Sequence, residues 1–222
     1  MLFRSNTTAG FSIVDYTGTG ALGTIAHGLG VAPTVLIVKG RDDGHSWNVK
    51  HPGAGTEVLL LETTDAGSSG SSEFNNTAPT SSVFTVNTAG GTNQDGEKYI
   101  AYCFAPIKGY SHFGSVRGNA NADGPFAYTG FKPAWIMYKV ESTTDDWMVF
   151  DSKRIHSPTQ HDYLEPNTTD AEGFIAVTFL SNGFKITEAS GDKFNASGET
   201  YIYMAFAEHP FVSSEGVPTT AG

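Results

Sequence analysis

The sequence GEKYIAYCFA at residues 96–105 returns as GETYIYMAFA at residues 198–207. Each stretch is a short run of alternating side chains, which predicts a β-strand with one buried face. Other features recur at a spacing of 100 residues, so the chain contains two copies of one unit. The residues that recur are Gly18, Gly30, Pro33, Lys39, Trp47, Val49 and Phe84, which return as Gly118, Gly130, Pro133, Lys139, Trp147, Val149 and Phe184.

This duplication predicts the domain boundaries. The first copy spans residues 10–108 and the second spans 109–211, between a lead-in at 1–9 and a flexible tail at 212–222 that is rich in Ser, Pro, Thr and Gly. The junction at residues 105–109 is very short and passes from one strand directly into the next. We therefore expect the copies to pack as one unit around a shared core, with approximate twofold symmetry.

The composition favours an all-β fold. Gly accounts for 26 of 222 residues and charged residues for only 16%, and Gly, Asn, Asp and Pro separate short runs typical of strands. We predict an antiparallel β-sandwich, jelly-roll or lectin-like, built from the two repeats of about 100 residues. The predicted strands are 10–16, 34–39, 46–50, 57–61, 82–86 and 98–105 in the first copy, and 110–116, 134–140, 146–150, 161–164, 184–187 and 200–207 in the second.

Charge and hydropathy argue against several classes of protein. The net charge of −10 and the lack of a Lys/Arg cluster disfavour nucleic acid as a partner. No apolar run approaches the roughly 20 residues that cross a bilayer, and Met1 leads into polar sequence, so we expect neither membrane insertion nor classical secretion. Cys103 is the only cysteine, which excludes an intrachain disulfide. We expect it to be buried on a strand.

Acidic residues precede a tryptophan in both copies: Asp42 and Asp43 before Trp47, and Asp145 and Asp146 before Trp147. Glycoside cleavage needs two carboxylates, so such a cluster raises the possibility of a glycan-degrading enzyme. Adjacent residues on a strand point to opposite faces, however, and a dipeptide is poorly arranged to supply that pair. We predict a solvated turn, no catalytic residue and no enzyme activity.

Aromatic residues supply the candidate core and the candidate binding sites. Four that recur in both copies, Trp47, Trp147, Phe104 and Phe206, are expected to fill the core. The alternative is a sugar-binding platform in which Trp135 and Tyr128 extend the two tryptophans. Loop aromatics beside small polar residues are better candidates for receptor binding, because loops carry recognition. These candidates are Phe74, Asn75, Asn76, His161, Asp162 and Tyr163.

No cofactor is expected from the sequence. The seven histidines lack a known zinc spacing. Asn119, Asn121 and Asp123 could supply oxygen atoms to a structural calcium ion, although the usual calcium-loop spacing is absent. The copies differ most in a Gly/Ser loop at residues 65–72 of the first and a longer segment at 152–161 of the second. Those segments are where we expect the copies to have diverged.

An ordered set of short motifs resembles one family over residues 10–220. The chain is similar to the duplicated β-domain of virion structural proteins from tailed bacteriophages, notably marine phages that infect cyanobacteria and related hosts. The motifs include FSIVDYTG at 11–18, HGLGVAP at 27–33, NNTAPT at 75–80, YIAYCFA at 99–105, DGPF at 123–126, YTGF at 128–131, FLSNGFK at 179–185 and AFAE at 205–208.

The resemblance implies a virion protein, synthesised in the host cytoplasm and placed on a tail appendage or on the capsid surface. It implies the head of a tail fibre or appendage that contacts a host receptor or glycan, with other virion proteins as partners and a homotrimer as a possible assembly. A capsid decoration or tail-assembly protein without receptor binding is the alternative. No catalytic motif accompanies the resemblance, so it transfers no functional residue.

Overall fold

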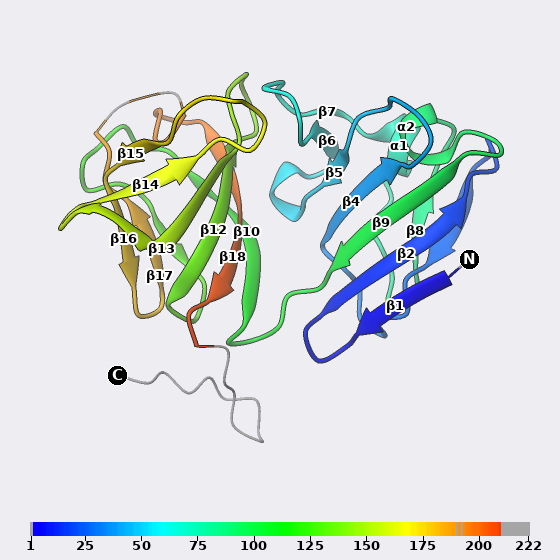
Figure 1. Ribbon diagram of the computed structural model, residues 1–222, viewed down its shortest axis with the longest axis horizontal. Coiled ribbons are helices and arrows are strands. Elements are labelled where there is room, and N and C mark those ends of the chain that lie inside the picture. The colour runs from blue at the N-terminus through cyan, green and yellow to red at the C-terminus, as the bar shows by residue number, and fades with distance from the viewer. Residues whose placement is uncertain (1, 190, 192, 210–222) are drawn as a thin grey trace. The chain divides into compact units, whose positions relative to one another are not determined.

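The computed structural model describes residues 2–189, 191 and 193–209, and the chain divides into two compact units (Figure 1). Unit 1 comprises Met1–Glu62 and Gly67–Pro106, and unit 2 comprises Thr63–Ala66 and Ile107–Gly222. The main division thus falls two residues before the predicted boundary at 108. The predicted lead-in contributes a strand to unit 1, and the predicted flexible tail lies outside the described residues.

Unit 1 contains a seven-stranded antiparallel sheet and a two-stranded one. The large sheet has the order β1-β2-β9-β4-β5-β6-β7, and the small sheet pairs β3 with β8. The large-sheet strands are Leu2–Asn6, Phe11–Thr17, Lys98–Phe104, Val35–Gly40, Asn48–Lys50, Glu57–Leu60 and Ser68–Ser69 in that order. β3 is Gly23–Ala26, β8 is Val83–Val86, and three short helices are η1 (Pro52–Ala54), α1 (Ser71–Phe74) and α2 (Gly90–Asn93).

The core of unit 1 lies between these sheets and under α1. Along β2 and β9 every second side chain is buried, as a period of two predicts for a half-buried strand. The inward residues of the large sheet meet Ile25, Phe84 and Val86 from the small sheet and Phe74 from α1. Cys103 is buried on β9 as expected, and burial raises the pKa of its thiol to about 12.

Unit 2 contains a six-stranded sheet, β10-β18-β12-β13-β14-β15, and a three-stranded sheet, β11-β17-β16. The six strands are Ser111–Arg117, Thr200–Ala207, Pro133–Val140, Met148–Ser157, Gln160–Leu164 and Gly173–Ile175 in that order. The three strands are Phe126–Tyr128, Gly183–Ile186 and Val177–Leu180. All pairings in both sheets are antiparallel.

Most of the described buried hydrophobic residues form two clusters with no member in common, one in each unit, while others such as Leu59 and Ile202 belong to neither. The prediction of a single core shared by both copies is therefore wrong. Each unit brings apolar residues from two sheets to its own cluster. The all-β antiparallel sandwich itself is confirmed. Close packing of the copies and a twofold relation between them stay predictions.

The two units have the same central strand order, β2-β9-β4-β5-β6 in unit 1 and β10-β18-β12-β13-β14 in unit 2. Equivalent tyrosines repeat as well. Tyr99 and Tyr201 are equivalent, and each stacks on another tyrosine, at 5.2 Å and 5.1 Å between ring centroids. The partners, Tyr16 on β2 and Tyr138 on β12, belong to strands that are not equivalent. These shared features support the duplication read from the sequence.

All twelve predicted strands correspond to strands in the structure, but six further strands were missed. β1, β3, β7, β11, β15 and β16 are at most five residues long, which is too short for a period of two to be recognised. All four helical residues of α2 are Gly, Thr or Asn, which have low helix propensity, so the sequence did not indicate this helix. No helix in the described part of the chain is long and apolar enough to cross a membrane.

Candidate functional site

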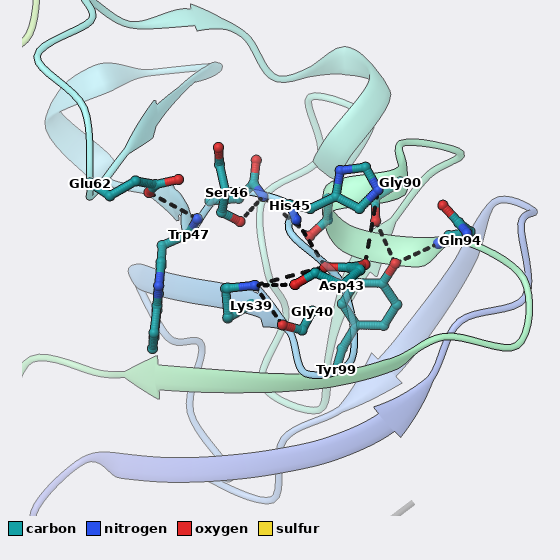
Figure 2. Close-up of polar contacts among 12 residues, drawn as sticks. Lys39, Gly40, Asp43, His45, Ser46, Trp47, Glu62, Gly90, Gln94 and Tyr99 are labelled. Carbon is teal, nitrogen blue, oxygen red and sulfur yellow. Dashed lines mark hydrogen bonds and ion pairs between the residues drawn. The ribbon is translucent and has the colours of Figure 1, made fainter.

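The acidic turn of unit 1 is held by internal contacts (Figure 2). The Lys39 ammonium donates to the carbonyl oxygens of Gly40 at 2.7 Å and Asp43 at 3.2 Å, and lies 3.8 Å from the Asp43 carboxylate. Asp43 also accepts a hydrogen bond from the His45 N–H at 3.0 Å. Asp42 instead pairs with Lys98 at 3.9 Å. The two carboxylates thus have different partners and do not face each other as a catalytic pair.

In unit 2 the equivalent acids form an ion-pair network around Lys193. Its ammonium lies 2.8 Å from Asp146, 2.7 Å from Glu165 and 3.7 Å from Asp145. Burial alone would raise the pKa of Asp146, but hydrogen bonds from Lys193 and Asn167 hold that pKa below its usual value. The proton donor of a glycosidase needs a raised pKa to keep its proton, so the lowered pKa disfavours that role for Asp146.

The four predicted core aromatics fall into two groups. Trp147 is 3% exposed and therefore buried as predicted, although it belongs to neither core cluster. Trp47, Phe104 and Phe206 are only half-buried and lie outside both core clusters, so their assignment to the core is wrong. Phe104 and Phe206 alternate with the inward residues of β9 and β18, which places them on the other face of each sheet. Trp47 stacks on Tyr102 of that face at 6.2 Å.

The first predicted binding loop, at residues 74–76, is only partly a loop. Phe74 ends α1 and is fully buried in the core of unit 1, so its assignment to receptor binding is wrong. Asn75 and Asn76 follow it with φ of 52° and 51°, a left-handed conformation that asparagine adopts more readily than most residues. Both asparagines are exposed. Phe74 was misread because a short helix turns its ring inward.

The second predicted loop, at residues 161–163, is strand β14. Its side chains therefore alternate between two faces. Tyr163 packs on the core of unit 2, and Nδ1 of His161 donates to the Val177 carbonyl oxygen at 3.1 Å, beside Phe179. Neither is on a recognition loop, which corrects that expectation. Asp162 belongs to the opposite face of the strand.

Asp162 lies in an aromatic and charged surface on β13, β14 and β15, which we call the β13–β14 face. The Asp162 carboxylate is 3.0 Å from Nδ1 of His156, and the His156 ring stacks on Phe174 at 3.9 Å with the planes 8° apart. Phe174 is directly opposite Asp162 in the sheet and remains 53% exposed. An ion pair between Arg154 and Glu172 completes the surface. His156 and Phe174 were missed, because Phe174 begins a continuous apolar run, FIAV at 174–177, rather than an alternating one.

The β13–β14 face is specific to the second copy. β13 has ten residues where its counterpart β5 has three, and the hairpin of β13 with β14 extends past its neighbours in Figure 1. This confirms the predicted divergence at residues 152–161. A flat exposed ring beside a carboxylate and an imidazole offers both stacking and hydrogen bonding to a sugar or a polar side chain.

The three candidate calcium ligands serve as turn caps. The Asn119 side-chain oxygen accepts from the Asn121 N–H at 3.0 Å, and that of Asn121 accepts from the Asp123 N–H at 2.8 Å. Asp123 pairs with Lys185. Among the described residues, no group of three or more His, Cys, Asp or Glu side chains is placed to hold a metal ion.

The chain belongs to the family described as Domain of unknown function (DUF7483), whose model matches residues 3–210. No curated protein and no solved structure matches the chain.

Proposed function

We propose that this member of the DUF7483 family is a bacteriophage virion structural protein that attaches the particle to the host surface, as the head of a tail fibre or similar appendage. The β13–β14 face carries the proposal. It presents an exposed aromatic ring with fixed polar partners on a rigid sheet, and the first copy has no hairpin of that length. The first copy forms its sandwich without an extended hairpin, so the longer hairpin of the second copy is not needed for the fold.

The chemistry of the face suits a glycan of the host surface. One side of the Phe174 ring is covered by His156, while the remaining exposed ring could stack on the apolar face of a sugar. Asp162 and His156 would then accept and donate hydrogen bonds at the ring hydroxyls. Affinity at one such face is weak, and a homotrimer would raise it by increasing the effective concentration of sites.

Two experiments test this function. Immunogold labelling with an antibody to the chain should place it at the ends of tail appendages on intact particles. The purified chain should bind cells on which the phage grows, and Phe174→Ala should lower that binding about tenfold, as loss of a central aromatic contact does. Phe126→Ala is the matched control, because Phe126 is an exposed aromatic on β11 outside the face.

The outcomes separate the alternatives. Gold over the head would replace host attachment with capsid decoration, and absence of gold from every particle would remove the virion assignment. Equal cell binding by the wild type and Phe174→Ala would show that the β13–β14 face is not the receptor-binding surface.

A further inference from the structure

Lys50 lies on the core side of the large sheet of unit 1, between two apolar core residues. It ends β5, and its neighbours in the adjacent strands are Leu36 on β4 and Val58 on β6. Both neighbours belong to the core cluster of unit 1. Residues directly opposite each other in a sheet point to the same face, so the Lys50 side chain is directed toward the core side. Lys50 is accordingly only 7% exposed.

The second copy shows what this position holds when only packing is required. The equivalent residue is Phe150, which pairs with Ile136 just as Lys50 pairs with Leu36. Phe150 is fully buried and belongs to the core cluster of unit 2. The fold therefore accepts a large apolar side chain here, and the charge of Lys50 is a property of the first copy alone.

The Lys50 ammonium has no counter-charge among the residues that the structure describes. Its contact is with the Phe74 ring, whose centroid is 5.8 Å from Nζ. Burial lowers the pKa of Lys50, because removal of water disfavours the charged form. A cation–π contact recovers part of that loss, but buried ammonium groups ordinarily have a carboxylate or carbonyl partner as well. The site lacks an anion.

Lys50 lines a cavity of about 340 Å³. That volume is near the lower limit for small-molecule sites, roughly 300 Å³. Its walls are largely apolar and include Pro33, Pro52 and Pro79, while Thr34 and Asn76 add polar groups. The Thr34 hydroxyl oxygen is buried without a hydrogen-bond partner in the described structure. Two residues with an unpaired polar group, Lys50 and Thr34, thus line the same cavity.

We propose that this cavity binds an acidic sugar, with the sugar carboxylate on Lys50 and the apolar face of the sugar ring against the proline walls. The carboxylate supplies the counter-charge that Lys50 lacks and an acceptor for the Thr34 hydroxyl. One ammonium and one hydroxyl match a singly charged carboxylate better than a phosphate, which is usually held by several N–H donors or an arginine.

A peptide carboxylate fits the cavity less well than a sugar acid does. Bound peptides rely on main-chain hydrogen bonds to their receptor. Pro33, Pro52 and Pro79 have no N–H to offer from the cavity walls. The proposal does not rest on the virion assignment, since it concerns unit 1 and a ligand that can be added to the purified protein.

The test is a calorimetric titration of the full chain with sodium glucuronate, methyl glucoside, inorganic phosphate and a dipeptide with a free carboxylate. Glucuronate should bind the wild type at least tenfold more tightly than the neutral glucoside, as expected for loss of a charged hydrogen bond. Lys50→Met should lose that preference, whereas Lys98→Met, which removes an exposed lysine outside the cavity, should keep it.

Several results would overturn the proposal: no binding of glucuronate, equal binding of glucuronate and glucoside, tighter binding of phosphate or of the dipeptide, or unchanged binding by Lys50→Met. Lys50→Met should fold, because Phe150 shows that the position accepts an apolar residue. If it does not, Thr34→Val keeps the side-chain shape, removes the unpaired hydroxyl, and should weaken glucuronate binding severalfold. Unchanged glucuronate binding by a folded Thr34→Val would then count against the proposal.

Discussion

Single buried asparagines organise one loop in each copy. The side-chain oxygen of Asn93 accepts from the Thr19 N–H at 2.9 Å, and its amide donates to the carbonyl oxygens of Ala21 at 2.6 Å and Asn87 at 2.7 Å. Asn195 makes the equivalent contacts with Asn119, Asn121 and Glu188. Each amide therefore satisfies backbone groups that would otherwise be buried without partners.

We expect Asn93→Ala and Asn195→Ala each to lower the free energy of unfolding by about 1–3 kcal/mol, because buried backbone groups lose their hydrogen bonds. Urea unfolding followed by fluorescence measures this change. Asn6→Ala is the control, since Asn6 is exposed and caps only the Ala9 N–H. A cost no greater than that of the control would mean that water replaces the asparagine side chain.

Among the strands, one carboxylate links the start of β12, the middle of β13 and the end of β18. Glu208 follows β18 and forms ion pairs with Lys132, just before β12, at 2.8 Å, and with Lys153 on β13. Hydrogen bonds from Lys132 and Lys153 lower the pKa of Glu208 from its ordinary 4.5 to about 2. The folded state therefore holds the ionised form more strongly than the unfolded chain does.

This difference predicts an acid-sensitive contribution to stability. A carboxyl group whose pKa is lower in the folded state than in the unfolded chain stabilises the fold at any pH above the unfolded-state pKa. For Glu208 this contribution is lost as the pH falls from about 4.5 toward 2. Glu208→Gln should cost about 1 kcal/mol at pH 6, because both lysines are largely exposed. The difference from the wild type should shrink in urea unfolding at pH 4, 3 and 2.5. A difference that does not change with pH would show that packing, not charge, stabilises this corner.

For the molecule as a whole, the central fact is that each unit has its own core. Phe84 and Phe184 are equivalent, fully buried residues, one in each cluster. Phe84 packs edge-on against Tyr16 and Phe184 packs edge-on against Tyr138. Removal of either ring should leave a cavity in one sandwich only.

Phe84→Ala and Phe184→Ala should each cost about 3–5 kcal/mol. Residue-resolved hydrogen exchange should show lost protection mainly in the unit that carries the substitution. The two variants serve as controls for each other. Equal loss of protection in both units after either change would mean that the cores unfold as one.

The two surfaces that we propose for binding were predictable only in part. Asp162 was identified from its aromatic and histidine neighbours in the sequence, and the longer segment at 152–161 pointed to the same hairpin. His156 and Phe174 were missed because they meet Asp162 through strand pairing, at sequence separations of 6 and 12 residues. Lys50 looked like an ordinary strand residue. That its charge is buried became evident only from its 7% exposure in the structure and from the apolar Phe150 at the equivalent position.

Patterns that act over a few residues, or that repeat, could be read directly from the chain. Alternation predicted the twelve main strands, and the recurrence at 100–102 residues revealed the duplication, because both signals are carried by neighbouring or equivalent positions. Burial could not be read in this way. Phe74 is in the core and Phe104 is not because burial depends on which distant elements cover each face of a sheet. That covering arises only when the two sheets of each sandwich and their short helices come together.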